Sequence, residues 1–280
     1  VRNAAAMVWD TLYGVDSNLV PRRQMIESED VSEDGLTWNF RLRPGLVFHD
    51  GQPVLAKDAV ASLRRWAARD VTGQRIVQNQ EALVALDDRN FRWTLRRPFP
   101  KMLYALAKSN TPCTFVMPER IALTDPFKII DQYVGSGPMR LVKEEWQPGA
   151  RIVFERFEGY RPREEPASWM AGGKRMHFDR IEWLIMPDSS AAAGALQTGE
   201  VDWLETPVPD LVPILERAAG ISTGIANDLG VVSGIRLNHL QPPFDDVRVR
   251  RAILTAVQQD DYLSAIVGND PAMRRPMNGF

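Results

Sequence analysis

The stretch that decides the fold is Ser32–Ser62, whose sequence is SEDGLTWNFRLRPGLVFHDGQPVLAKDAVAS. Residues 37–42 alternate between polar and apolar types, which predicts a strand with one buried face. The apolar run 46–48 predicts a second, shorter strand after a Pro-Gly turn. From Ala56 onward the apolar residues follow the spacing of one helix face. The stretch therefore predicts a compact scaffold unit, and it contains no catalytic arrangement.

The composition is that of a globular protein. The chain has 280 residues, 44% of them hydrophobic and 25% charged, which is enough for one large or two ordinary domains. A net charge of −2 gives no electrostatic reason to expect nucleic acid as a partner. The single cysteine, Cys113, excludes an intrachain disulfide. The chain opens on Val1 and closes on a loop-like segment, so we expect it to be a piece of a longer protein that lacks its export signal.

Outside the opening stretch, apolar periodicity and turn residues predict the remaining elements. We predict helices over residues 4–13, 102–107, 118–123, 188–196, 209–219 and 247–267, with Gly14 ending the first of them. We predict strands over residues 81–86, 91–95, 139–142, 152–157, 181–186, 201–204, 221–226 and 231–237. The alternation of strands and helices from residue 181 onward favours an α/β lobe, and residues 134–138 (VGSGP) form a joint before it.

The sequence contains few candidates for chemistry. Its three histidines, His49, His177 and His239, lie far apart and lack metal-ligand spacing, so we interpret them as surface or hydrogen-bonded residues. The glycines of Gly135-Ser136-Gly137 are spaced neither for a nucleophile elbow nor for a phosphate loop. They favour a joint whose backbone closely approaches another element or a ligand. We therefore predict no catalytic residue, no metal and no cofactor.

Five sequence blocks, in order, carry a resemblance to a known family. The opening stretch resembles the signature block of the family 5 extracellular solute-binding proteins, the peptide and nickel binding components of bacterial ABC importers. Further matches are Gly135–Pro138, residues 152–160, residues 195–202 (ALQTGEVD) and residues 237–252. The sequence departs from the family pattern at Leu55, where a threonine usually caps the helix. We expect this change to cost about 1 kcal/mol of stability.

The resemblance implies a fold and a division into domains. The fold is α/β, of the periplasmic binding protein-like kind (type II, cluster C), with a first lobe and a small extra domain, while the second lobe is largely missing. Residues 1–16 and 135–240 then form the first lobe, residues 17–134 the small mixed α/β domain, and residues 241–280 the start of the second lobe.

The resemblance also implies a function. It predicts a substrate-binding component that captures an oligopeptide, a dipeptide or a similar small solute in an interlobe cleft. Its partner is an ABC permease in the inner membrane, its location is periplasmic, and it is a monomer that is not an enzyme and binds no nucleic acid. A periplasmic hydrolase and a sensor or chaperone module on the same fold remain alternatives.

The ligand contacts that the resemblance implies on this chain are few. They are Arg75 after the first small-domain helix, Asn110, Thr111 and Cys113 in a loop that reaches the cleft, and Ser136 and Gly137 at the joint. Trp169, in an irregular segment, is a further candidate, with Met170 beside it. Thr111 stands where nickel-type members carry arginine, which argues against a carboxylate-bearing metal chelate as the ligand.

Overall fold

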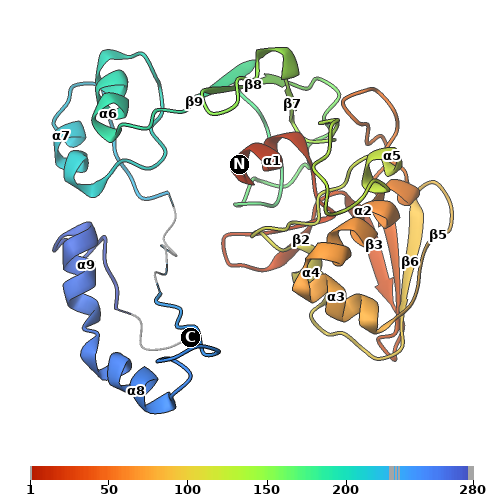
Figure 1. Cartoon of the computed structure of the whole chain (residues 1–280). Helices are drawn as coiled ribbons and strands as arrows, with labels where there is room; N and C mark the ends of the chain where they lie inside the picture. The colour runs from red at the N-terminus through yellow and green to blue at the C-terminus, as the bar shows by residue number, and fades with distance from the viewer. Residues whose placement is uncertain (1, 227–229, 231, 233, 277–280) are drawn as a thin grey trace. The chain divides into compact units, whose positions relative to one another are not determined.

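The computed structural model describes residues 2–226, 230, 232 and 234–276 (Figure 1). The chain divides into two compact units, which we call unit 1 (Val1–Ile185) and unit 2 (Met186–Phe280). The predicted division into lobes at residues 16, 134 and 240 stays a prediction.

Unit 1 is built on a four-stranded antiparallel sheet with the order β3-β4-β6-β5. Its strands are β3 (Ile26–Val31), β4 (Thr37–Leu42), β5 (Gln80–Ala85) and β6 (Asn90–Leu95). The alternation in β4 is confirmed, since Trp38, Phe40 and Leu42 are buried. The register pairs Trp38 with Trp93 and Phe40 with Phe91. Cross-strand aromatic pairs of this kind stabilise a sheet through side-chain packing, and the Phe40 and Phe91 rings stack at 4.9 Å.

Helices cover the buried face of this sheet (Figure 1). Helix α2 (Ala56–Arg69) contacts β5 and β6 and contributes Ala59, Val60, Leu63 and Trp66 to the core. Asp70 then begins α3 (Val71–Gln78) by accepting bonds from the amides of Thr72 and Gly73. No separate helix was predicted over α3, because the polar residues after Arg69 carry no clear apolar periodicity. The short helices α4 (Met102–Leu106) and α5 (Glu119–Ala122) are confirmed.

A three-stranded antiparallel sheet, β7-β8-β9, completes unit 1. It is made of β7 (Met139–Leu141), β8 (Arg151–Arg156) and β9 (Arg180–Leu184), with the short η1 (Lys143–Glu145) between the first two. Helix α1 (Arg2–Val8) contacts β7, and Val8 shares a small apolar cluster with Met139 and Phe154. These three strands were predicted from the sequence.

Two predictions in unit 1 are wrong. The first helix ends at Val8 instead of Tyr13, because Tyr13 lies in β1 (Tyr13–Val15), which pairs with β2 (Pro21–Arg23). Gly14 is therefore a strand residue and not a helix stop, and a Cβ there would overlap the carbonyl of Met170. Residues 46–48 form only one bridge, Val47 to Pro53, because this loop bonds to itself from Phe48 to Gln52.

Unit 2 is helical in its described part. It contains α6 (Ser189–Thr198), η2 (Pro209–Leu211), α7 (Val212–Glu216), α8 (Val247–Ala256) and α9 (Gln259–Val267). The predicted ends of α6 are confirmed, since Asp188 accepts from the amide of Ala191 and Gly199 has φ 73°. The predicted helix 209–219 is shorter and begins as a 3-10 turn.

Three further predictions in unit 2 fail. The predicted helix 247–267 is split between α8 and α9, where Asp260 and Asp261 suit the start of a new helix. Residues 201–204 and 221–226 form no strand, because a strand needs a neighbour to supply its hydrogen bonds and the described part of unit 2 contains none. The strand predicted over 231–237 includes residues 231 and 233, which lie outside the described residues.

The cap of α2 gives a test of local stability. Leu55 has the extended backbone of an N-cap residue, and its amide donates a hydrogen bond to the Asp58 carboxylate at 2.8 Å. The leucine side chain has no oxygen with which to accept the hydrogen bond that would complete the pair. We predict that Leu55→Thr completes this reciprocal pair and raises the free energy of unfolding by about 1 kcal/mol. Urea denaturation measures the change.

The matched control is Leu55→Val, which has the shape of threonine without its hydroxyl. A gain of the same size in both variants would mean that shape, and not the cap bond, stabilises the helix.

Candidate functional site

The joint Gly135–Pro138 lies against the end of α1. The amide of Gly137 donates to the carbonyl oxygen of Val8 at 2.9 Å. A Cβ at Gly135 would overlap that oxygen, and a Cβ at Gly137 would overlap the carbonyl of Met7. These two glycines therefore permit a backbone contact that no other residue allows. The predicted close approach is confirmed, and the element approached is α1.

His49 lies on the other side of the joint. Its ring Nδ1 accepts from the amide of Gly135 at 3.4 Å, and its Nε2 lies 3.0 Å from the carbonyl oxygen of Gly137. Ser136 is 5% exposed, and its Oγ has no partner among the described residues. Because both ring nitrogens of His49 are bonded to backbone, the imidazole has no lone pair with which to activate this serine. The joint therefore lacks the nucleophile–base pair that a hydrolase would need.

Four of the predicted contacts lie near the end of α2. Arg75 is exposed on α3, Asn110 and Thr111 are exposed in the loop after α4, and Cys113 in the same loop is buried. Two contacts hold this loop against the junction of α2 and α3. Lys108 forms an ion pair with Asp70, the N-cap of α3, and the indole Nε1 of Trp66 donates to the carbonyl of Pro112 at 3.0 Å. The loop that carries residues 110–113 therefore lies against the start of the helix that carries Arg75.

The remaining candidate, Trp169, lines a pocket of about 510 Å³ formed by the loop 164–177. Trp169 is 50% exposed and has φ 49°, a conformation that costs a non-glycine residue backbone energy. Hydrogen bonds hold the residues on both sides of Trp169. The Met170 amide donates to the carbonyl oxygen of Val15 at 3.0 Å, and the Ser168 hydroxyl accepts from the amide of Ser17 at 3.1 Å. These bonds hold the backbone on both sides of Trp169 next to β1, and the indole itself is exposed.

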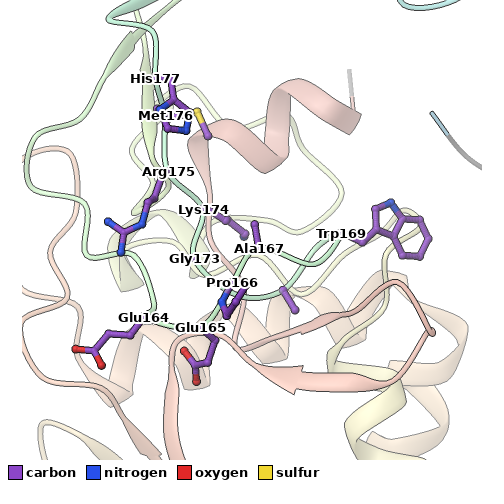
Figure 2. Close-up of a pocket in the computed structure, with 11 residues that line it drawn as sticks. Glu164, Glu165, Pro166, Ala167, Trp169, Gly173, Lys174, Arg175, Met176 and His177 are labelled. Atoms are coloured by element: carbon purple, nitrogen blue, oxygen red, sulfur yellow. The ribbon is translucent and has the colours of Figure 1, made fainter. Parts of the chain in front are cut away.

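The pocket carries charges of both signs. Figure 2 shows Glu164, Glu165 and Arg175 on one side of the pocket. The indole of Trp169 points away from them. Arg163 binds Glu165 through two nitrogens, at 3.0 and 2.7 Å, and holds the pKa of that carboxyl at about 2. Glu164 and Arg175 are exposed, and within the described residues their side chains form no hydrogen bond or ion pair. The pocket thus has charged groups on one side, while the indole points away from them.

A buried polar network anchors the pocket wall, and the sequence analysis missed it. Asp10 is 1% exposed, and its carboxylate accepts from Lys174 Nζ at 2.8 Å and from the Tyr160 hydroxyl at 3.2 Å. Burial and the nearby Asp10 carboxylate raise the pKa of Tyr160, which therefore stays a donor. Lys174 lines the pocket itself. No sequence pattern links residues 10, 160 and 174, because only the folded chain brings them together.

Within the described residues, no group of three or more histidine, cysteine, aspartate or glutamate side chains is placed to hold a metal ion. None of the helices in the described part has the length and apolar character needed to cross a membrane.

The buried ion pair predicts a large loss of stability. We expect Lys174→Met to lower the free energy of unfolding by about 3–5 kcal/mol, because it leaves the Asp10 carboxylate buried without its cation. Chemical denaturation measures the loss. The control is Arg175→Met at the neighbouring exposed position, which should change stability by less than about 0.5 kcal/mol. Equal effects of the two substitutions would contradict this role of Lys174.

The joint predicts a second loss. We expect Gly135→Ala to lower the free energy of unfolding by about 1–3 kcal/mol, because the added methyl group displaces the end of α1. Gly194→Ala in α6 is the control. A Cβ there meets no atom within 4 Å, and alanine favours a helix interior. If Gly135→Ala is as stable as the parent protein, the joint does not depend on this contact.

Comparison with known proteins gives one family across most of the chain. Residues 20–277 match the family "Bacterial extracellular solute-binding proteins, family 5 Middle". The "Probable peptide ABC transporter periplasmic-binding protein y4tO" of Sinorhizobium fredii is 39% identical over 278 residues, 99% of this chain and 52% of the relative. The glutathione-binding protein GsiB of Escherichia coli K12 is 29% identical over 259 residues, 91% of this chain and 47% of the relative. The chain thus spans about half the length of these relatives.

Solved structures show the same fold. The periplasmic binding protein DppA of Helicobacter pylori, in complex with the peptide STSA, matches 93% of this chain and 52% of its own with a TM-score of 0.72 and 24% identity. NikA of Brucella suis, in complex with Fe(III)-EDTA, matches 95% of this chain and 52% of its own with a TM-score of 0.70 and 20% identity.

These matches confirm the predicted cluster C periplasmic binding protein fold. The family consists of solute-binding proteins, which confirms the prediction that the chain is not an enzyme. The chain belongs to the family 5 bacterial extracellular solute-binding proteins.

Proposed function

We propose that this protein is the solute-binding component of a bacterial ABC importer and that it binds a peptide or a similar small solute in a cleft between two lobes. The observation that carries the proposal is the 39% identity, over 99% of the chain, to a relative named as a probable peptide ABC transporter periplasmic-binding protein. The partner is an ABC permease in the inner membrane, and the location is periplasmic. The protein acts as a monomer.

The local structure supports a binding role. Hydrogen bonds of the residues on both sides of Trp169 hold its backbone, so little backbone freedom is lost when a ligand packs on the exposed indole. The free charges of Glu164 and Arg175 in the same pocket complement the charged ends of a peptide. Arg75, Asn110, Thr111, Cys113, Ser136 and Gly137 stay predicted contacts. Of these residues, the two at the joint are covered within unit 1, so a ligand would reach their backbone only if the joint opened.

The test is calorimetric titration of the complete protein with pooled short peptides, glutathione and a nickel–histidine complex. We expect saturable binding of peptides. Binding of glutathione or the nickel complex without any peptide binding would replace the proposed ligand class. No binding of any of the three would contradict the function itself.

The pocket gives a specific prediction within this function. We expect Trp169→Ala to raise the Kd for a bound peptide about tenfold, because a buried aromatic contact contributes about 1.4 kcal/mol or more to binding. The same calorimetric titration measures the change.

Phe127→Ala is the matched control, since Phe127 is 72% exposed and does not line the pocket. An unchanged Kd in Trp169→Ala, with peptide binding intact, would remove the loop 164–177 from the ligand site and leave the transport function standing.

A further inference from the structure

Two sequence motifs that carry no ligand chemistry meet in unit 1. The loop Phe48–Gly51 contains the His-Asp-Gly motif, and the joint contains the Gly-Ser-Gly-Pro motif. The amide of His49 donates to the carbonyl oxygen of Gly135 at 2.8 Å. The ring of the same histidine bonds the amide of Gly135 and the carbonyl of Gly137. Within the described residues, no other side chain bonds residues 135–137.

The bonding partners determine the tautomer of the ring. A backbone amide only donates, so Nδ1 must present its lone pair to Gly135. A carbonyl oxygen only accepts, so Nε2 must carry the proton that Gly137 receives. The geometry therefore requires a neutral imidazole protonated at Nε2 alone. A second proton on Nδ1 would face the Gly135 amide hydrogen and remove that bond.

The surroundings oppose a charged ring. The edge of the imidazole packs on Phe157, with ring centroids 4.8 Å apart and an angle of 70°. Burial lowers the pKa of His49, and Arg140 on β7 adds to this effect, while the bond to Gly137 and the adjacent Asp50 oppose it. Asp50 is itself paired with Arg120 of α5 at 2.8 Å. Asp50 on the same loop and Arg140 on β7 are thus the charged groups that act on the ring, and Arg120 of α5 partly neutralises Asp50.

The joint has no substitute for this histidine. On one side its backbone lies against the last carbonyls of α1, with no space for a side chain. The Ser136 hydroxyl is buried and has no partner in the described part of the chain, so it satisfies neither neighbouring backbone group. The backbone groups that face away from α1 depend on His49.

We propose that His49 is a positioning residue, which as a neutral Nε2–H imidazole clamps the joint against α1 and makes that clamp sensitive to acid. Protonation at Nδ1 breaks the hydrogen bond that the Gly135 amide donates. The joint then loosens at residues 135–137, just before β7. The inference concerns the stability and geometry of the joint, so it stands or falls independently of the ligand.

The first test is the tautomer, read from the ring nitrogen chemical shifts of the uniformly ¹⁵N-labelled protein at neutral pH. The variants His177→Gln and His239→Gln assign the signals of the other histidines. We expect His49 to be unprotonated at Nδ1 and protonated at Nε2. A His49 protonated at Nδ1, or charged at neutral pH, would overturn the proposal. This test uses the parent sequence at position 49 and needs no folded His49 variant.

The second test is the pH dependence of unfolding. A histidine with a lowered pKa in the folded state binds its proton more readily when unfolded, so stability falls as the pH drops through the ordinary histidine pKa of about 6.5 toward the folded value. Gln at position 49 keeps one acceptor and one donor but does not titrate. We expect His49→Gln to lose less stability than the parent between about pH 7.5 and about pH 5, a span that brackets that pKa.

The control His177→Gln removes an exposed histidine and should keep the pH profile of the parent. His49→Leu, which removes both bonds, should be less stable than His49→Gln at neutral pH. Parallel profiles of His49→Gln and the parent would overturn the acid sensitivity. Equal stability of the leucine and glutamine variants would overturn the clamp.

Discussion

The contact between the glycine backbone of the joint and the end of α1 holds the first helix of unit 1 against its three-stranded sheet. Gly137 donates to Val8 at 2.9 Å, and a side chain at Gly135 or Gly137 would overlap α1 carbonyls. Because the chain passes so close to α1, β7 leaves the joint in a direction that buries Val8, Met139 and Phe154 together. One backbone contact thus joins the first helix to a sheet that lies more than a hundred residues later in the sequence.

Polar groups inside unit 1 hold the loops that the apolar core does not reach. The Asp10 carboxylate would be costly to bury alone, and Lys174 with Tyr160 offsets that cost while fixing the pocket loop against the segment between α1 and β1. Arg163, just before the loop, adds to this by donating to the carbonyls of Gln24 and Ile26. The loop around Trp169 is therefore positioned by charge pairing and backbone bonds more than by hydrophobic packing.

For a solute-binding protein, this arrangement separates the scaffold from the recognition surface. The aromatic pairs between β4 and β6 and the helix α2 above them form a rigid support. The exposed groups proposed for ligand contact, such as Arg75 and Trp169, lie on a helix surface and a loop that this support carries. Binding residues are commonly found on loops of this kind, because a change there leaves the core packing intact.

The sequence by itself determined the family, the strands β4, β5 and β6 and the helix α2, since alternation in β4 and helical spacing after Ala56 are local patterns that burial on one face enforces. It also predicted the close approach at the joint, because two glycines without Cβ atoms leave room for the backbone of another element. It did not predict β3 or the order of the sheet. Only the tertiary structure decided that Tyr13 lies in a strand, that residues 221–226 do not, and that Asp10 meets Lys174. A strand forms only where a neighbouring strand supplies its hydrogen bonds. A buried charge is stable only where an oppositely charged side chain lies beside it. Both conditions depend on residues far away in the sequence, which no local pattern records.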